Sequence, residues 1–308
     1  MRIVTVNVYG FAYAPLDQII QETCNGEFDV FNIQEYNHFA PPLIDKNYKC
    51  IQSSNYTGLL SIINPKNGWK LQNYKEEVWK PNIDDNRIVP RSALILLLEN
   101  EYCGSKVSIA NVHLCGGRYD ELYVNQVKSH ELHMFQNTML SLKNGLLHQV
   151  LRHEPDVIVG DFNSDVICYI DQSTTRYRGY VHPAQLQFWK QLCTELSTEE
   201  DVIKDRLIQW NCAPFELLEK SGYKLVLGKN EREEKRHTSW FAKHGTSVFG
   251  PTPDAIWYKK GADNNQKVTI DLFHRICLIN GDSHDYLEML SDHDALLACF
   301  RIKESSTS

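Results

Sequence analysis

Short apolar runs bounded by turn residues recur along the chain, and this pattern predicts β-strands. Each run is rich in Val, Ile, Leu or aromatic residues. The predicted strands are Arg2–Val8, Asp29–Ile33, Leu59–Ile63, Ser92–Leu98, Lys106–Asn111, Asp156–Val159, Ala255–Tyr258, Val268–Arg275 and Ala295–Ile302.

Helical patterns lie between these runs, and Gly145 is expected to break the second of them. The predicted helices are Leu16–Cys24, Leu122–His153, Pro183–Thr194, Glu199–Gln209 and Pro214–Ser221. Because strands and helices alternate throughout, the pattern favours a layered α/β or α+β domain. There is no internal repeat and no long Gly, Ser or Pro linker. We therefore expect one domain over residues 1–303, with a mainly helical insertion at about 169–235 and a frayed tail at 304–308.

The composition permits a globular enzyme. Hydrophobic residues make up 42% of the 308 residues, which is enough for a sizeable core. With a net charge of −7, the chain lacks the overall positive charge that is typical of a non-specific nucleic-acid binder. An acidic enzyme can still carry a basic rim at its active site, and bound Mg²⁺ adds local positive charge.

The nine cysteines form no C-x-x-C pair, which disfavours zinc ribbons and thioredoxin-type redox motifs and favours reduced thiols. The N-terminus begins on a strand pattern with no signal-peptide features. The longest apolar run, Ala93–Leu98, is too short to span a bilayer. We expect an intracellular protein, cytoplasmic or nuclear, with no transmembrane segment. The oligomeric state stays open, with a monomer favoured.

Polar side chains of catalytic type stand at the ends of several predicted strands. They are Asn7, Glu35, His113, Asp161 with Asn163, and Asp292 with His293. Strand ends are rigid supports, so side chains just beyond them can converge on one edge of a sheet. Glu35, Asp161 and Asp292 are hard oxygen ligands that suit Mg²⁺ or, alternatively, Mn²⁺.

An imidazole next to an acid suggests proton transfer. His293 is a candidate general base because its ordinary pKa lies near neutrality. Asp254, which opens a predicted strand, is the candidate to orient that ring. Each residue alone has a simpler explanation: His113 as a structural histidine, Asp-x-Asn at 161–163 as an Asx turn, and Glu35 as a solvent-facing carboxylate. The joint pattern favours a site.

Six motifs in this order carry a family resemblance. They are TVN ending at Asn7, NIQE ending at Glu35, NVH ending at His113, GDFN at 160–163, PDAIWY at 253–258 and SDH at 291–293. The set resembles the endonuclease/exonuclease/phosphatase superfamily over residues 4 to about 297. That resemblance implies a DNase I-like α+β fold, a four-layer α/β/β/α sandwich of two mixed sheets flanked by helices.

The resemblance also implies roles for individual residues. The metal ligands would be Glu35, Asn7 and Asp292. Asp161 would position or deprotonate the attacking water, and Asn163 would hold that water or the scissile phosphate. The remaining groups would contact phosphate oxygens or transfer protons: His113, and His293 oriented by Asp254. Arg91 could contact the phosphate or form a strand-end salt bridge, and the sequence favours neither.

We therefore predict a Mg²⁺-dependent phosphoester hydrolase. The preferred substrate is nucleic acid, cleaved by an endonuclease, exonuclease or DNA end-processing activity. The alternative is a lipid or small-molecule phosphoester, as in sphingomyelinases or inositol-phosphate phosphatases. A catalytically dead binding protein is disfavoured because each expected position holds a competent residue type. Two positions depart from family patterns. Many nucleases have Arg after the Asp that matches Asp254, where this chain has Ala255. The 5-phosphatases carry GDxNxR, whereas Ser164 and Asp165 follow Asn163 here, which disfavours an inositol phosphatase.

Overall fold

The computed structural model describes most of the two sheets and parts of the helical layers. The described residues are 1–8, 15–36, 47–54, 58–80, 90–115, 132–164, 212–226, 254–261, 267–276 and 295–303, with the single residues 166, 194, 199, 209 and 293. Two of the predicted helices, Pro183–Thr194 and Glu199–Gln209, lie almost entirely outside them.

The first sheet has six strands in the order β11-β12-β1-β2-β4-β3. Only the β1–β2 pair is parallel, and the other pairs are antiparallel. The strands are β1 (Arg2–Asn7), β2 (Val30–Gln34), β3 (Lys49–Gln52), β4 (Leu60–Ile63), β11 (Val268–Ile276) and β12 (Ala295–Ile302).

The second sheet has six strands in the order β5-β6-β7-β8-β10-β9. Here β7 and β8 are parallel, and the other pairs are antiparallel. The strands are β5 (Trp69–Trp79), β6 (Arg91–Asn100), β7 (Lys106–His113), β8 (Val157–Asp161), β9 (Tyr223–Leu225) and β10 (Asp254–Lys259). A short 3₁₀ turn, Pro65–Asn67, precedes β5.

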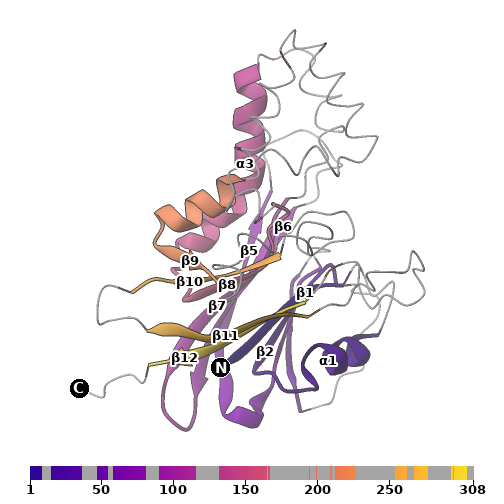
Figure 1. Ribbon diagram of the computed structural model, residues 1–308, viewed down its shortest axis with the longest axis vertical. Coiled ribbons are helices and arrows are strands. Elements are labelled where there is room, and N and C mark those ends of the chain that lie inside the picture. Colours follow the sequence, from indigo (N-terminus) through magenta and orange to yellow (C-terminus); the bar gives the residue numbers. More distant parts are fainter. Residues whose placement is uncertain are drawn as a thin grey trace, which may run out of the picture.

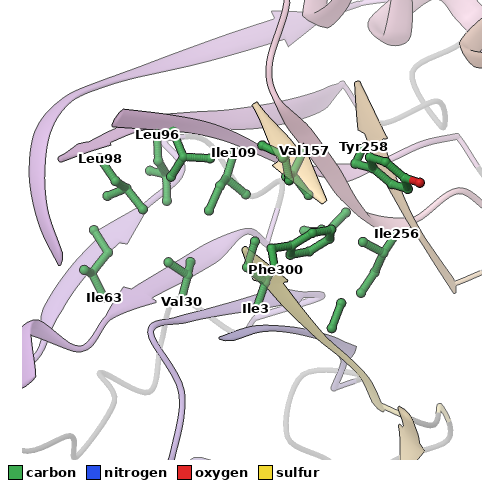
Figure 2. Close-up of a cluster of buried hydrophobic side chains, with 14 of the residues drawn as sticks. Ile3, Val30, Ile63, Leu96, Leu98, Ile109, Val157, Ile256, Tyr258 and Phe300 are labelled. Atoms are coloured by element: carbon green, nitrogen blue, oxygen red, sulfur yellow. The ribbon is translucent and has the colours of Figure 1, made fainter. Parts of the chain in front are cut away.

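The two sheets pack face to face through an apolar interior. Figure 2 shows Ile3, Val30 and Phe300 of the first sheet opposite side chains of the second. Alternate residues of β6, such as Leu94 and Leu96, point into this layer, as the period-two geometry of a strand requires. This interior forms the centre of the sandwich.

Helices cover the two outer faces (Figure 1). The helix α1 (Leu16–Cys24) buries Ile19 and Ile20 in a cluster with the outer side chains of the first sheet. The helix α3 (Leu132–Leu151) and a helical segment at 212–220 cover the second sheet. The four-layer α/β/β/α sandwich expected from the resemblance is therefore confirmed.

The observed strands include all nine that the apolar pattern predicts. Three others, β3, β5 and β9, were not predicted. All three lie at an edge of a sheet, and β5 is largely polar and exposed. An edge strand pairs on one side only, so its sequence need not carry a strong apolar alternation.

Residues 212–226 fall inside the predicted insertion but pack into the sandwich. Phe215 and Leu218 are buried in the outer cluster of the second sheet, and β9 hydrogen-bonds to β10. The rest of the predicted insertion, and the tail at 304–308, lie outside the described residues. None of the described helices is long and apolar enough to cross a membrane. Every cysteine in the described part of the chain is a free thiol.

Gly145 does not break α3, so that prediction was wrong. The helix runs through it to Leu151, and the glycine lies against Trp79 of β5. A Cβ atom at position 145 would stand 2.2–2.4 Å from atoms of the indole ring. The glycine therefore permits close packing of the helix on the sheet, which a propensity scale cannot detect.

This packing predicts how a substitution of Gly145 changes the free energy of unfolding. Ala normally stabilises a helix interior over Gly by about 1 kcal/mol. Here Gly145→Ala should instead destabilise the protein by about 1–3 kcal/mol, because the added methyl overpacks against Trp79. Denaturant unfolding measures the change. In a Trp79→Leu background the same substitution should be neutral or stabilising. Equal destabilisation in both backgrounds would contradict the packing explanation.

Candidate active site

Strand register brings the polar strand ends to one edge of the sandwich. In the first sheet Asn7 pairs with Gln34 at the end of the parallel β1–β2 pair, so Glu35 follows directly. In the second sheet His113 pairs with Asp161 at the end of the parallel β7–β8 pair. The antiparallel strand β10 begins at Asp254, also opposite Asp161. Both sheets therefore contribute to one cluster.

Asn7 links the acidic groups of the two sheets. Its Nδ2 donates to Glu35 Oε1 at 3.0 Å and to Asp161 Oδ2 at 3.0 Å. Asp161 is buried, whereas Glu35 is partly exposed. Glu35 has a φ of 56°, in the left-handed region that non-glycine residues rarely adopt. The backbone thus turns sharply where β2 ends, directly beyond the pairing of Asn7 with Gln34.

His113 lies between Arg91 and the two carboxylates. Arg91 Nη1 is 3.3 Å from His113 Nδ1, and His113 Nε2 is 3.7 Å from both Glu35 Oε1 and Asp161 Oδ2. A guanidinium can only donate hydrogen bonds, so Nδ1 must be the acceptor. In the neutral ring the proton is then on Nε2, facing the acids. His113 is therefore arranged to donate a hydrogen bond toward the cluster rather than to ligate a metal.

Charge and burial act together on the pKa of His113. Burial is the largest cause that holds it well below the ordinary value, and the positive charges of Arg91, His293 and Lys143 lower it further. The neutral tautomer inferred from the Arg91 contact agrees with this direction.

The candidate acid–imidazole pair is present. His293 Nδ1 lies 2.9 Å from Asp254 Oδ2, and both side chains are buried. Asp254 also affects Asp161. Burial raises the pKa of Asp161, and the negative charge of Asp254 raises it further, while His293, Asn7 and the Asn163 backbone lower it.

The turn after β8 is fixed on several sides. Asn163 has a φ of 48°; its backbone N–H donates to Asp161 Oδ1 at 2.7 Å, and its Nδ2 donates to the Leu114 carbonyl at 3.1 Å. The first contact is the Asx-turn bond that the sequence suggested as the simpler explanation. Gly160 precedes this turn with a φ of 138°, and a Cβ there would meet the Val112 carbonyl at 1.9 Å. Only glycine fits that position.

The cluster has the donor set of a divalent-cation site. Ligand atoms of Glu35, His113 and Asp161 lie within 4.8 Å of one another, as do those of Asp161, Asp254 and His293. Two carboxylates joined by the side-chain amide of Asn7 match the hard oxygen ligands that Mg²⁺ prefers. Because His113 Nε2 carries a proton in the arrangement above, the oxygen groups are the better candidates.

Asp292 lies outside the described residues. The other eight predicted site residues lie at this edge of the sandwich: Asn7, Glu35, Arg91, His113, Asp161, Asn163, Asp254 and His293. Arg91 was expected to contact phosphate or to form a strand-end salt bridge. It contacts His113, and the phosphate contact stays a prediction. No ion pair between Arg91 and an acid occurs among the described residues.

The sequence interpretation missed Lys143. This lysine of α3 is fully buried, and its ammonium donates to the Asn163 carbonyl. Burial lowers its pKa to about 8. A signal existed, because the positions three and four residues away on either side are all apolar: Met139, Leu140, Leu146 and Leu147. A charge in an apolar helical stripe marks an unusual buried group.

Comparisons with known proteins agree with this architecture. No family model matches the chain, and no curated protein matches it. Among solved structures, the human Nocturnin catalytic domain has 15% identity and a TM-score of 0.54, over 98% of this chain and 93% of that one. D. rerio TDP2 complexed with a single-strand DNA product has 15% identity and a TM-score of 0.52, over 98% of both chains.

Two Bacteroides structures are also similar. An endonuclease/exonuclease/phosphatase from Bacteroides vulgatus has 11% identity and a TM-score of 0.52, over 98% of both chains. Bacteroides thetaiotaomicron mannosyl-6-phosphatase Bt3783 has 11% identity and a TM-score of 0.50, over 98% of this chain and all of that one. The chain therefore has the DNase I-like fold of endonuclease/exonuclease/phosphatase proteins.

The Arg91–His113 contact yields a pH prediction. In Arg91→Met the pKa of His113 should rise, because a nearby positive charge is removed, but stay below about 6.5 because burial remains. NMR titration of the His113 ring in the metal-free protein measures this. The variant Arg301→Met, at a remote surface pair with Asp271, should leave the titration unchanged.

The depressed pKa of His113 also determines how the stability of the fold changes with pH. A histidine whose pKa is depressed on folding contributes stability that is present above about pH 6.5 and is lost as the pH falls, because the unfolded chain binds the proton more readily. That loss should be smaller in Arg91→Met. A His113 pKa that is unchanged or lowered in this variant would refute the arrangement.

Proposed function

We propose that the chain is a Mg²⁺-dependent phosphoester hydrolase. The observation that carries the proposal is that Glu35 and Asp161, which come from different sheets, both accept a hydrogen bond from the side-chain amide of Asn7. Beside this acidic pair stand the Nε2 of His113 and the buried His293–Asp254 pair. The carboxylates can bind a metal cation, and the imidazoles can donate hydrogen bonds to an anion. This combination suits a phosphate ester that is bound through a metal ion.

The residues that would hold the ion are Glu35 and Asn7, with Asp292 as a further ligand that the sequence supplies. Asp161 is close enough to share in this role. Bound Mg²⁺ supplies positive charge that neutralises the phosphate and stabilises the leaving oxygen. Mn²⁺ prefers the same class of oxygen ligands and is the alternative ion.

Each remaining side chain has a role that its contacts support. Asp161 positions or deprotonates the attacking water, and its raised pKa makes it a stronger base than an ordinary carboxylate. Asn163 holds this water or the scissile phosphate. His113 donates its Nε2–H to a phosphate oxygen, because Arg91 occupies its other nitrogen. His293, oriented by Asp254, contacts phosphate or transfers a proton.

Arg91 has room for a second role. Its Nε is buried with no hydrogen-bond partner among the described residues. A buried donor without a partner is rare in folded proteins, and a substrate oxygen would satisfy it. We therefore keep the phosphate contact of Arg91 in the proposal, next to its contact with His113.

For the substrate class we prefer nucleic acid. A structurally similar protein, D. rerio TDP2, is known in complex with a single-strand DNA product. The alternative is a lipid or small-molecule phosphoester. For the small-molecule class, a similar structure is named a mannosyl-6-phosphatase.

The metal requirement is tested by binding and by turnover. Mg²⁺ should raise the melting temperature of the wild type, by the equivalent of about 2.7 kcal/mol at 100 times its Kd. Glu35→Gln should lose most of that shift. It should also lose turnover by about 100-fold or more, because electrostatic stabilisation by a metal is worth several kcal/mol. Scanning calorimetry and a bis(4-nitrophenyl) phosphate assay give the two readouts.

The matched control for this test is Glu99→Gln, a partly exposed acid paired with Lys106 away from the site. It should keep both the Mg²⁺ shift and the turnover. EDTA should abolish wild-type activity. Full activity in EDTA, or an unchanged Mg²⁺ shift in Glu35→Gln, would reject the metal site.

A substrate panel tests the ester. It contains nicked and abasic DNA, 5′-tyrosyl DNA, RNA, sphingomyelin, inositol polyphosphates and mannose 6-phosphate. We expect cleavage of a nucleic acid, with a rate that falls as salt rises because phosphate contacts release counterions. Asp161→Asn, purified in parallel, should be inactive and so exclude a contaminating nuclease. Cleavage of only the last three compounds would overturn the preferred class.

A further inference from the structure

Lys143 occupies a position where a charge is costly. It is one of the largest fully buried side chains among the described residues, together with Trp257, Phe28 and Phe31. It lies in the middle of α3, next to Leu142 and one turn from Leu146, both buried. Removing an ammonium group from water carries a large penalty unless the group is paired or hydrogen-bonded. A Met or Leu side chain would fill this layer without that penalty.

One contact of Lys143 leads to the candidate active site. Its ammonium donates to the backbone carbonyl of Asn163, twenty residues further along the chain. This bond joins the outer helical layer to the turn that follows β8. The charge of Asp161 raises the pKa of Lys143 and the charge of Arg91 lowers it, so the lysine interacts electrostatically with the groups of the site.

The turn at Asn163 needs external support. Its left-handed φ of 48° is tolerated by Asn better than by most residues, yet it is not the preferred backbone conformation. Three groups hold it: Asp161 accepts its N–H, the Leu114 carbonyl accepts its side-chain N–H, and Lys143 donates to its carbonyl. Asp161 and Leu114 belong to the sheet edge, so Lys143 supplies the support from the helix.

We propose that Lys143 is a positioning residue, whose buried ammonium fixes the backbone of Asn163 and so holds the Asp161–Asn163 turn in its working geometry. This inference rests on the proposed function, because the turn carries two residues of the hydrolytic site. Lys143 acts through Asn163 and does not touch the reacting atoms. Its burial lowers its pKa to about 8, the direction expected for an ammonium group removed from water.

The test compares Lys143→Met with Lys143→Gln and with a packing control. Met keeps an apolar stem out to the Cε position and removes the ammonium donor, so kcat for bis(4-nitrophenyl) phosphate should fall roughly 10- to 100-fold, the cost of a small misplacement in a site. KM should stay within about twofold, and the melting temperature should hold or rise, because a buried charge has been replaced by an apolar chain of similar volume. Gln retains an N–H donor one atom shorter and should recover part of kcat.

Leu147→Val is the packing control, because Leu147 is fully buried on the same helix and belongs to the apolar cluster. It should lower the melting temperature and leave kcat of the folded protein unchanged. A fall in melting temperature with Lys143→Met that matches this control, with kcat intact, would make Lys143 an ordinary structural residue and overturn the proposal.

Hydrogen exchange of the Asn163 amide decides the proposal without any substrate. The bond to Asp161 Oδ1 protects this amide, so Lys143→Met should speed its exchange roughly tenfold or more while amides of β8 keep their protection. Unchanged exchange would refute the positioning role even if turnover falls. If the wild type cleaves no ester in the panel but Asn163 exchange still depends on Lys143, the proposed function fails and the positioning inference stands.

Discussion

The position of the two sheets relative to each other depends on a buried polar bridge around Asn111. The main cluster of side chains between the sheets is apolar, and apolar contacts do not by themselves specify register. At the edge that carries the site, Gln34 of β2 donates to Asn111 Oδ1 of β7 at 2.6 Å. Asn111 in turn donates toward the Ile33 and Leu60 carbonyls of the first sheet at 3.3 and 3.2 Å. Sliding one sheet over the other would leave these groups buried and unsatisfied, at a cost of about 1–3 kcal/mol each. The bridge thereby sets which residues of the two sheets meet.

The composition of the site follows from that bridge. Glu35 is the residue after Gln34, and His113 is two residues after Asn111. The hydrogen bond between Gln34 and Asn111 therefore also fixes how close Glu35 and His113 lie to each other. The parallel pairs β1–β2 and β7–β8 then end at the same edge, where Asn7 joins acids of both sheets. The side chains leave the strands through sharp turns, and both Glu35 and Asn163 have a positive φ there. Such strain persists only where surrounding contacts determine the backbone, and it is concentrated at functional sites.

Local pattern sufficed for the elements that bury an apolar face. The helix α1 was predicted at its observed bounds, and the strands of both sheet interiors were located, because their periodicity records which side is buried. The local pattern failed where contacts between residues distant in sequence determine the structure. The edge strand β5 has too little apolar alternation, and Gly145 packs against Trp79, which is distant in sequence. The candidate site residues were found from motif and strand end together. The apolar stripe around Lys143 indicates a buried lysine, but its link to the site was missed because the Asn163 carbonyl is a backbone atom that no sequence motif marks.

The electrostatics of the edge oppose the stability of the metal-free fold. Asp161 and Asp254 face each other across β8 and β10, and both burial and their mutual repulsion raise the pKa of Asp161. A carboxyl group whose pKa is raised on folding contributes stability at low pH that is lost as the pH rises through its folded value, so its ionised form carries a cost in the folded protein. The chain offsets part of this cost with His293 and Asn7, while Arg91 and Lys143 place further positive charge around His113. A divalent cation held by Glu35 and Asn7 beside Asp161 would offset more of this cost, and stability and the proposed catalysis would then depend on the same ion.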